Sequence, residues 1–362
     1  MDRPMAFSRR GFLGTCGAAL AATALPQGAR AAYAPRPEGW RTFETVTRVT
    51  LPAGETGAQA WVPVPSFQAA DWARPGINSF DTNGTAELVM DETQGVAFVH
   101  ARWEAGVMPE LTVTSTMDTQ SRYVDLTPTG VTLTDAERAT LTAPTDLIPT
   151  DGIVADTAAQ ITDGASGDLE KAQRIYDWVV TQTERNPETR GCGLGDVASM
   201  LHTGDLTGKC ADLNALYVGL ARAAGLPARD LYGLRVAPSA FGYSALGAGS
   251  EVVTGAQHCR AEVFLDGIGW VPVDPADVRK VVLQEDGGLS LEDAKVAEAR
   301  KGLFGSAEGN WIVYNDAHDV VLPGSARDAL PFLMYPQAEI DGRAQDELDP
   351  ARFVYTITAR QL

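Results

Sequence analysis

The stretch Gly208-Lys209-Cys210-Ala211-Asp212-Leu213 places a cysteine where a helix is expected to begin. Apolar residues then recur at helical spacing as far as Ala224, and Gly225 and Pro227 end the pattern. The free N–H groups and the dipole of a first helical turn favour a thiolate, which is the nucleophilic form of cysteine. We therefore expect Cys210 to be a nucleophile, and a buried cysteine that only packs is the alternative.

A histidine follows in a predicted strand, His258-Cys259-Arg260-Ala261-Glu262-Val263-Phe264. Side chains alternate along a strand, so His258 is expected to point away from Cys259. A neutral imidazole near Cys210 would take the thiol proton or pair with the thiolate. A structural histidine is the alternative interpretation of this strand.

An aspartate ends the return strand of the hairpin that Asp266-Gly267 predicts, in Gly269-Trp270-Val271-Pro272-Val273-Asp274-Pro275. A carboxylate at this place can hold the histidine ring and select its tautomer. Asp before Pro is also an ordinary turn former. Asp277 is a nearby rival that lies past the strand.

Four blocks of the chain resemble, in order and spacing, the transglutaminase-like superfamily, which includes papain-fold peptidases and amide-transfer enzymes. The blocks are residues 208–213, 223–229, 258–263 and 269–275. The resemblance implies an α+β fold with a papain/transglutaminase-like core, in which the helix carrying the cysteine packs on an antiparallel sheet. It also implies Cys210 as nucleophile, His258 as base and acid, and Asp274 as the group that orients the histidine.

The chemistry implied by this resemblance is acyl transfer on an amide bond of a peptide or protein substrate. Hydrolysis is favoured over cross-linking because water is the default acceptor. A binding or scaffold protein that keeps the fold but does little chemistry is the alternative. The backbone N–H of Cys210 can supply one oxyanion donor, and Asn186 and Gln182 are candidates for the second.

The flanking regions are predicted to be β-rich. Many short strands separated by turns suggest a sandwich-like domain and a connector over residues 32–150, ahead of a catalytic core at 151–283. Trp61-Val62-Pro63-Val64-Pro65 resembles the β-rich leader that precedes such cores in bacterial members. Residues 284–362 are expected to add a helix and a β extension.

The first residues contain a twin-arginine pattern, Ser8-Arg9-Arg10-Gly11-Phe12-Leu13, followed by a small-residue apolar stretch and Ala29-Arg30-Ala31. This combination predicts a signal peptide over residues 1–31 that is cleaved near Ala31, and export to the periplasm. No later stretch is apolar for the ~18 residues of a membrane span.

Composition and cysteine count narrow the remaining possibilities. The 47 acidic against 29 basic residues give a net charge of −18, which is unfavourable for nucleic-acid binding. No motif predicts a metal or another cofactor, and the oligomeric state is left open. After signal cleavage Cys192, Cys210 and Cys259 remain, as one reactive thiol with a Cys192–Cys259 disulfide or as three free thiols. The glycine-rich loop 237–257 is either a flap near the site or a plain surface loop.

Overall fold

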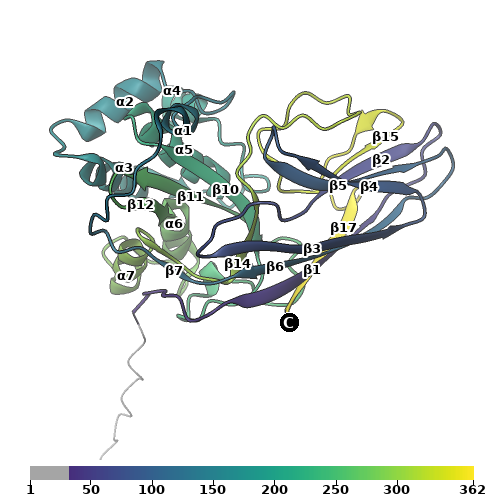
Figure 1. Ribbon diagram of the computed structural model, residues 1–362, viewed down its shortest axis with the longest axis horizontal. Helices are drawn as coiled ribbons and strands as arrows, with labels where there is room; N and C mark the ends of the chain where they lie inside the picture. The colour runs from purple at the N-terminus through teal and green to yellow at the C-terminus, as the bar shows by residue number, and fades with distance from the viewer. Residues whose placement is uncertain (1–31) are drawn as a thin grey trace, which may run out of the picture. The chain divides into compact units, whose positions relative to one another are not determined.

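The computed structural model describes residues 32–362, and the predicted signal peptide lies outside the described residues. The described chain forms a β-sandwich and an α+β core (Figure 1). None of its helices is long and apolar enough to cross a membrane.

The sandwich consists of two antiparallel sheets with strand orders β17-β1-β6-β3 and β16-β15-β2-β5-β4 (Figure 1). Inward-facing apolar side chains from both sheets form one cluster, with Val49 and Val113 from the first sheet and Val62 and Val99 from the second. Alternating burial along β6 reflects this two-sided arrangement. The strands are β1 (Arg41–Thr50), β2 (Ala58–Pro63), β3 (Ala73–Thr82), β4 (Thr85–Asp91), β5 (Val96–Trp103), β6 (Glu110–Thr119), β15 (Gln337–Ile340), β16 (Arg343–Ala344) and β17 (Val354–Gln361).

The last strands of the chain complete the sandwich. Strand β17 pairs antiparallel with β1, placing Thr358 opposite Val46, and β15 pairs with β2, placing Gln337 opposite Trp61. The region 284–362 therefore contributes strands to the sheets that the N-terminal region begins. These strands cover edges of β1 and β2 that would otherwise expose unpaired backbone groups.

The core is built on a separate antiparallel sheet, of order β12-β11-β10-β14. Helix α5 (Cys210–Ala223) packs on β10 and β11, and α2 and α3 cover its other side (Figure 1). This explains why α5 is buried almost all round, since a helix between two layers has no solvent face. The core elements are α2 (Gly152–Thr162), α3 (Asp168–Gln182), β10 (Ala228–Arg235), β11 (Gln257–Leu265), β12 (Gly269–Val273), α6 (Pro275–Gln284), α7 (Ala294–Gly302) and β14 (Trp311–Asn315).

Short elements connect these layers. They are β7 (Arg122–Tyr123), α1 (Asp135–Leu141), β8 (Glu184–Arg185), α4 (Val197–Thr203), β9 (Thr207–Gly208), the 3-10 turn η1 (Ser244–Leu246) and β13 (Ser306–Ala307). A shared apolar cluster joins sandwich and core, with Phe43 and Met117 from the sandwich and Leu213 and Trp311 from the core. The predicted α+β fold, with the helix carrying Cys210 on an antiparallel sheet, is confirmed.

Candidate active site

Cys210 is the first residue of α5, as the sequence predicts. The preceding loop is held by Asp212, whose carboxylate accepts hydrogen bonds from the backbone N–H groups of Lys209 (2.9 Å), Leu194 (2.9 Å) and Gly195 (3.0 Å). A Cβ at Gly193, where φ is +94°, would lie 1.8 Å from the Asp212 Oδ2 atom. Glycine is therefore required for the loop to approach the helix start so closely.

His258 and Asp274 are in direct contact. The His258 Nε2 atom lies 2.7 Å from Asp274 Oδ2, and both side chains are almost fully buried. This leaves Nδ1 as the ring nitrogen available to Cys210. The other carboxylate oxygen of Asp274 accepts hydrogen bonds from the backbone N–H of Asp277 (3.0 Å) and from the side chain of Asn214 (3.2 Å). Asp274 is therefore fixed by three partners.

Asn214 links the three elements of the site. It lies on α5, one turn after Cys210, and its Nδ2 donates to the backbone carbonyl of Cys259 on β11 (2.8 Å) as well as to Asp274. Its Oδ1 lies 3.4 Å from the backbone nitrogen of Ala276 in α6. One buried amide thus positions the cysteine helix against the histidine strand and against α6.

Asp277, the rival of Asp274, is also near the histidine. Its Oδ2 lies 3.4 Å from His258 Nε2, while its Oδ1 accepts a 2.6 Å hydrogen bond from the Arg235 guanidinium. Asp277 is thus already neutralised by a buried arginine. The shorter contact and the uncommitted charge both favour Asp274 as the residue that orients His258.

Charges around the ring determine its protonation. Burial and the Arg235 guanidinium lower the pKa of His258. The Asp277 and Asp274 carboxylates, and the hydrogen bond that the ring donates to Asp274, outweigh these effects and raise the pKa to about 9. The pKa of Cys210 lies well below its usual range. The largest cause is a hydrogen bond with Cys192, and the next is one with Cys259; burial acts in the opposite direction. A hydrogen bond with His258 and the positive charge of its ring lower the pKa further. A thiolate–imidazolium pair is consequently the favoured state near neutral pH.

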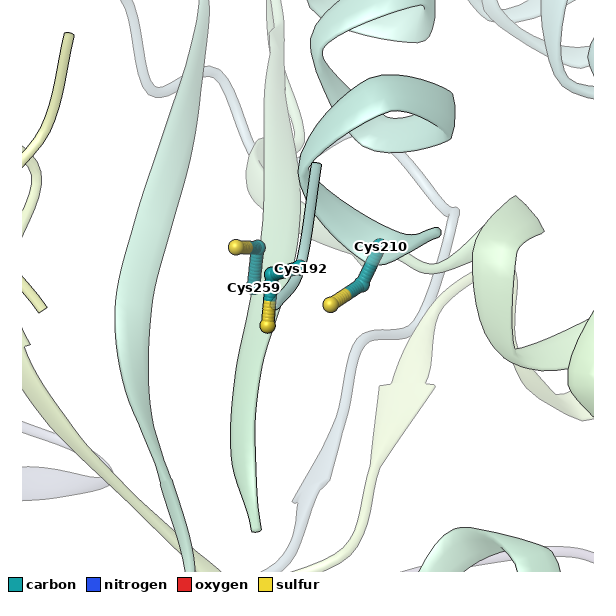
Figure 2. A group of neighbouring side chains, drawn as sticks. All are labelled: Cys192, Cys210 and Cys259. Carbon is teal, nitrogen blue, oxygen red and sulfur yellow. The ribbon is translucent and has the colours of Figure 1, made fainter. Parts of the chain in front are cut away.

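Three thiols meet at this point. Cys192 comes from the loop before α4, Cys210 from the start of α5 and Cys259 from β11, and their sulfur atoms lie within 4.8 Å of one another (Figure 2). All three are buried and none forms a disulfide. Of the two states considered from the sequence, this is the one with three free thiols and no Cys192–Cys259 disulfide. The pKa of Cys192 is raised chiefly by its hydrogen bond with Cys210, and that of Cys259 chiefly by burial. Cys192 and Cys259 therefore stay protonated and stabilise the Cys210 thiolate, while the Gln257 backbone carbonyl, 3.4 Å from the Cys192 sulfur, is a competing acceptor for the Cys192 thiol.

Two groups of side chains in the described chain have the spacing of metal ligands. One is the three thiols, and the other is His258 with Asp274 and Asp277. In the second group the Arg235 guanidinium and the protonated imidazole already balance the two carboxylates. An ion pair network explains that group fully, without a cation from solution.

A cavity of about 630 Å³ opens over the site, and Cys192, Cys210 and His258 form part of its wall. Loop residues 247–249 and 254–256 form another part, so the glycine-rich loop does lie beside the site. Asn186 and Gln182 point elsewhere: the Asn186 amide nitrogen lies 3.5 Å from Thr207 Oγ1, and Gln182 is exposed at the end of α3. The cavity wall of the described chain includes neither of these two residues.

Comparison with known proteins gives the family of the part of the chain that carries these residues. The family model of the transglutaminase-like superfamily matches residues 155–275, a range that contains Cys210, His258 and Asp274. The chain is 34% identical over 339 residues to an uncharacterized protein of Haemophilus influenzae, covering 88% of this chain and 91% of that protein.

One solved structure has a similar fold across most of its length. A candidate cysteine protease from Cytophaga hutchinsonii is similar with a TM-score of 0.51 and 16% identity, over 90% of this chain and 99% of that chain. The periplasmic domain of TgpA from Pseudomonas aeruginosa has a TM-score of 0.34 and 15% identity, over 68% and 91% of the two chains. With its core matched by the family model and its fold shared across almost the whole chain, the protein belongs to the transglutaminase-like superfamily.

Proposed function

We propose that the protein is a cysteine enzyme of acyl transfer that hydrolyses amide bonds in peptide or protein substrates. The observation that supports this most directly is the buried 2.7 Å contact between His258 and Asp274, beside a thiol whose pKa is held low, at the wall of an open cavity. A packing cysteine would need neither the charged partners nor the access.

The reaction begins when the Cys210 thiolate attacks the carbonyl carbon of the amide. The oxyanion that forms is stabilised by the backbone N–H of Cys210, which as the first N–H of α5 has no acceptor within the helix. The His258 imidazolium then gives its proton to the leaving amine, and the C–N bond breaks to leave a thioester on Cys210.

Water completes the cycle. Neutral His258 removes a proton from a water molecule as its oxygen attacks the thioester, and the C–S bond breaks to release a carboxylic acid and restore the thiolate–imidazolium pair. Asp274 stays ionised throughout and holds the ring in place. An amine in place of water would give amide transfer from the same intermediate.

Alkylation tests the proposal without knowledge of the substrate. Iodoacetamide should modify Cys210 at pH 6 far faster than a free thiol, because the ion pair keeps the sulfur ionised. Mass spectrometry separates Cys210 from Cys192 and Cys259, and Cys210→Ala serves as the control. Labelling as slow as that of a free cysteine, or unaffected in His258→Ala, would instead support a scaffold role.

We also propose that the protein is exported through its twin-arginine signal and acts in the periplasm. The support is the sequence Ser8-Arg9-Arg10-Gly11-Phe12-Leu13 ahead of an apolar stretch. Replacing Arg9 and Arg10 by lysine should leave the precursor inside the cell. Unchanged periplasmic recovery of this variant would contradict twin-arginine export.

A further inference from the structure

The cavity over Cys210 has a charge opposite to that of the whole protein. The chain carries a net charge of −18. The cavity wall nevertheless contains four cationic side chains and one carboxylate, namely Arg185, Lys209, Arg235, Lys280 and Glu347. Such a local reversal of sign is unexpected in a protein this acidic, and it concentrates anions at the cavity.

Three of these four cations have no carboxylate partner. Arg235 is paired with Asp277, and Glu347 lies 3.7 Å from Arg327 outside the cavity wall. Within residues 32–362, no salt bridge involves Arg185, Lys209 or Lys280. The cavity therefore holds positive charge that the protein itself does not neutralise.

The three cations reach the cavity from separate elements that meet near the nucleophile. Lys209 directly precedes Cys210. Arg185 lies on β8, where it pairs in parallel register with Gly208. Lys280 lies on α6, three residues after Asp277 and so on the same side of that helix. The backbone thus directs three positive side chains toward one end of α5.

Two of these cations, Arg185 and Lys280, are also poorly solvated. The Nε atom of Arg185 is buried with no hydrogen-bond acceptor in the described chain. Burial lowers the pKa of Lys280 to about 8, and repulsion from Arg235 and Arg185 contributes to the shift. Like charges that crowd together in a partly buried wall are stabilised when an anion binds between them.

We propose that Arg185, Lys209 and Lys280 form a carboxylate-binding subsite beside Cys210, so that the enzyme prefers acidic peptides with a carboxylate close to the amide that is cleaved. This inference rests on the proposed function, because the subsite is defined by its distance from the nucleophile. The alternative role for the same residues is to stabilise the Cys210 thiolate and nothing else.

Two alkylating agents that differ only in charge separate these roles. Iodoacetate and iodoacetamide react at the same kind of carbon, each forming an S–C bond and releasing iodide, but only iodoacetate carries a carboxylate. The second-order rate constants for Cys210 would be measured by mass spectrometry at pH 7 and low salt on the mature protein. The rate constant for iodoacetate is divided by that for iodoacetamide, and this ratio is divided by the same ratio for glutathione. A normalised ratio above 1 reports carboxylate binding.

We expect this normalised ratio to exceed about 5, and Arg185→Gln and Lys280→Gln each to lower it by about twofold or more, because each change removes one charge that attracts the carboxylate. Raising the salt concentration should lower it as well. Lys280→Arg should restore the preference, and Arg48→Gln, an exposed change on β1, should leave it unchanged. Thermal unfolding of each variant shows whether the fold is kept.

The result that would overturn the subsite is a normalised ratio near 1, or a loss of reactivity toward both reagents to the same extent in Arg185→Gln and Lys280→Gln. Equal losses would assign the cations to the thiolate alone. The absolute iodoacetamide rate tests the nucleophile separately, since the ratio can be measured even on a slowly reacting thiol. Failure of the proposed function and failure of the subsite are therefore distinguishable.

Discussion

Replacing Asp274 by asparagine tests which carboxylate orients His258. The amide oxygen can still accept from the Asp277 backbone N–H and from Asn214, so the start of α6 is preserved. The amide nitrogen now faces His258 Nε2 and donates to it, which places the ring proton on Nδ1. In that neutral tautomer the ring cannot accept the proton of Cys210.

The expected change in the pKa of His258 follows from the hydrogen bond that Asp274→Asn removes. A hydrogen bond to a charged group contributes about 1.5–3 kcal/mol, which corresponds to about 1–2 pKa units of His258. The carboxylates raise the pKa of His258, so the imidazolium is complete at low pH and is lost as pH rises through about 9. In Asp274→Asn this loss should occur about 1–2 units lower, and the thiolate–imidazolium pair should be about 10- to 100-fold less favoured.

The assay is the rate of Cys210 alkylation by iodoacetamide from pH 5 to pH 9. The matched control is the double variant Arg235→Gln/Asp277→Asn, which removes both charges of the neighbouring ion pair. The two charges act on His258 in opposite directions, so removing them together changes its pKa little. Exchanging both partners of a buried pair also avoids stranding either one.

We expect the upper inflection of the alkylation profile, where His258 loses its proton, to move about 1–2 pH units below about 9 in Asp274→Asn and to stay near its wild-type position in the double variant. An equal shift in the two proteins would mean that Asp277 has an orienting role. A wild-type pH profile for Asp274→Asn would refute the reasoning altogether, because the 2.7 Å contact would then contribute nothing to the ion pair.

Three further predictions concern other buried groups. Cys192→Ala should raise the pKa of Cys210 by about 0.5–1 unit, and Cys259→Ala should raise it by less. The measurement is the shift of the acid limb of the alkylation profile. Profiles identical to that of the wild type would contradict the role of these thiols as donors. Glu262 is buried between Arg122 and Arg229. Glu262→Gln should therefore lower the free energy of unfolding, measured in urea, by about 3–5 kcal/mol. A loss below about 1 kcal/mol would show that the two arginine charges become solvated by water instead. Burial raises the pKa of Asp230 from 3.8 to about 7, so its contribution to stability is complete below pH 3.8 and is lost as pH rises through about 7. Asp230→Asn should therefore gain thermal stability relative to wild type at pH 8 but not at pH 4, and a pH-independent difference would argue against the shift.

The sequence locates the candidate residues well because each depends on a local pattern. A helix start, a strand alternation and a hairpin end can each be recognised within a few residues, and they correctly place Cys210 on α5, His258 on β11 and Asp274 after β12. Pairing of distant strands has no such local signal. The addition of β15 and β17 to the N-terminal sheets depends on register across most of the chain.

Helix α6 shows how one signal can have two meanings. Asp274-Pro275 was compatible with a turn, but here Asp274 is the N-cap and Pro275 the first helical residue, a combination that also begins helices. The helix turns Asp277 back toward His258 and carries Lys280 to the cavity. Treating the dipeptide as a helix start would have placed Asp277 in the first turn facing back to the strand end, and would have brought Lys280 into consideration.

The thiol cluster depends on a contact that no local pattern contains. Asp212 could be assigned from the sequence as an acid in the first helical turn, a role that helps α5 to form. Its carboxylate also holds the N–H groups of Leu194 and Gly195, and the Ala211 N–H donates to the Cys192 carbonyl (2.9 Å). The residues that begin the helix therefore also place the Cys192 thiol beside Cys210. The low pKa of the Cys210 thiol is thus a property of the loop that Asp212 anchors as much as of the helix start, because the hydrogen bond with Cys192 is the largest single cause of the shift.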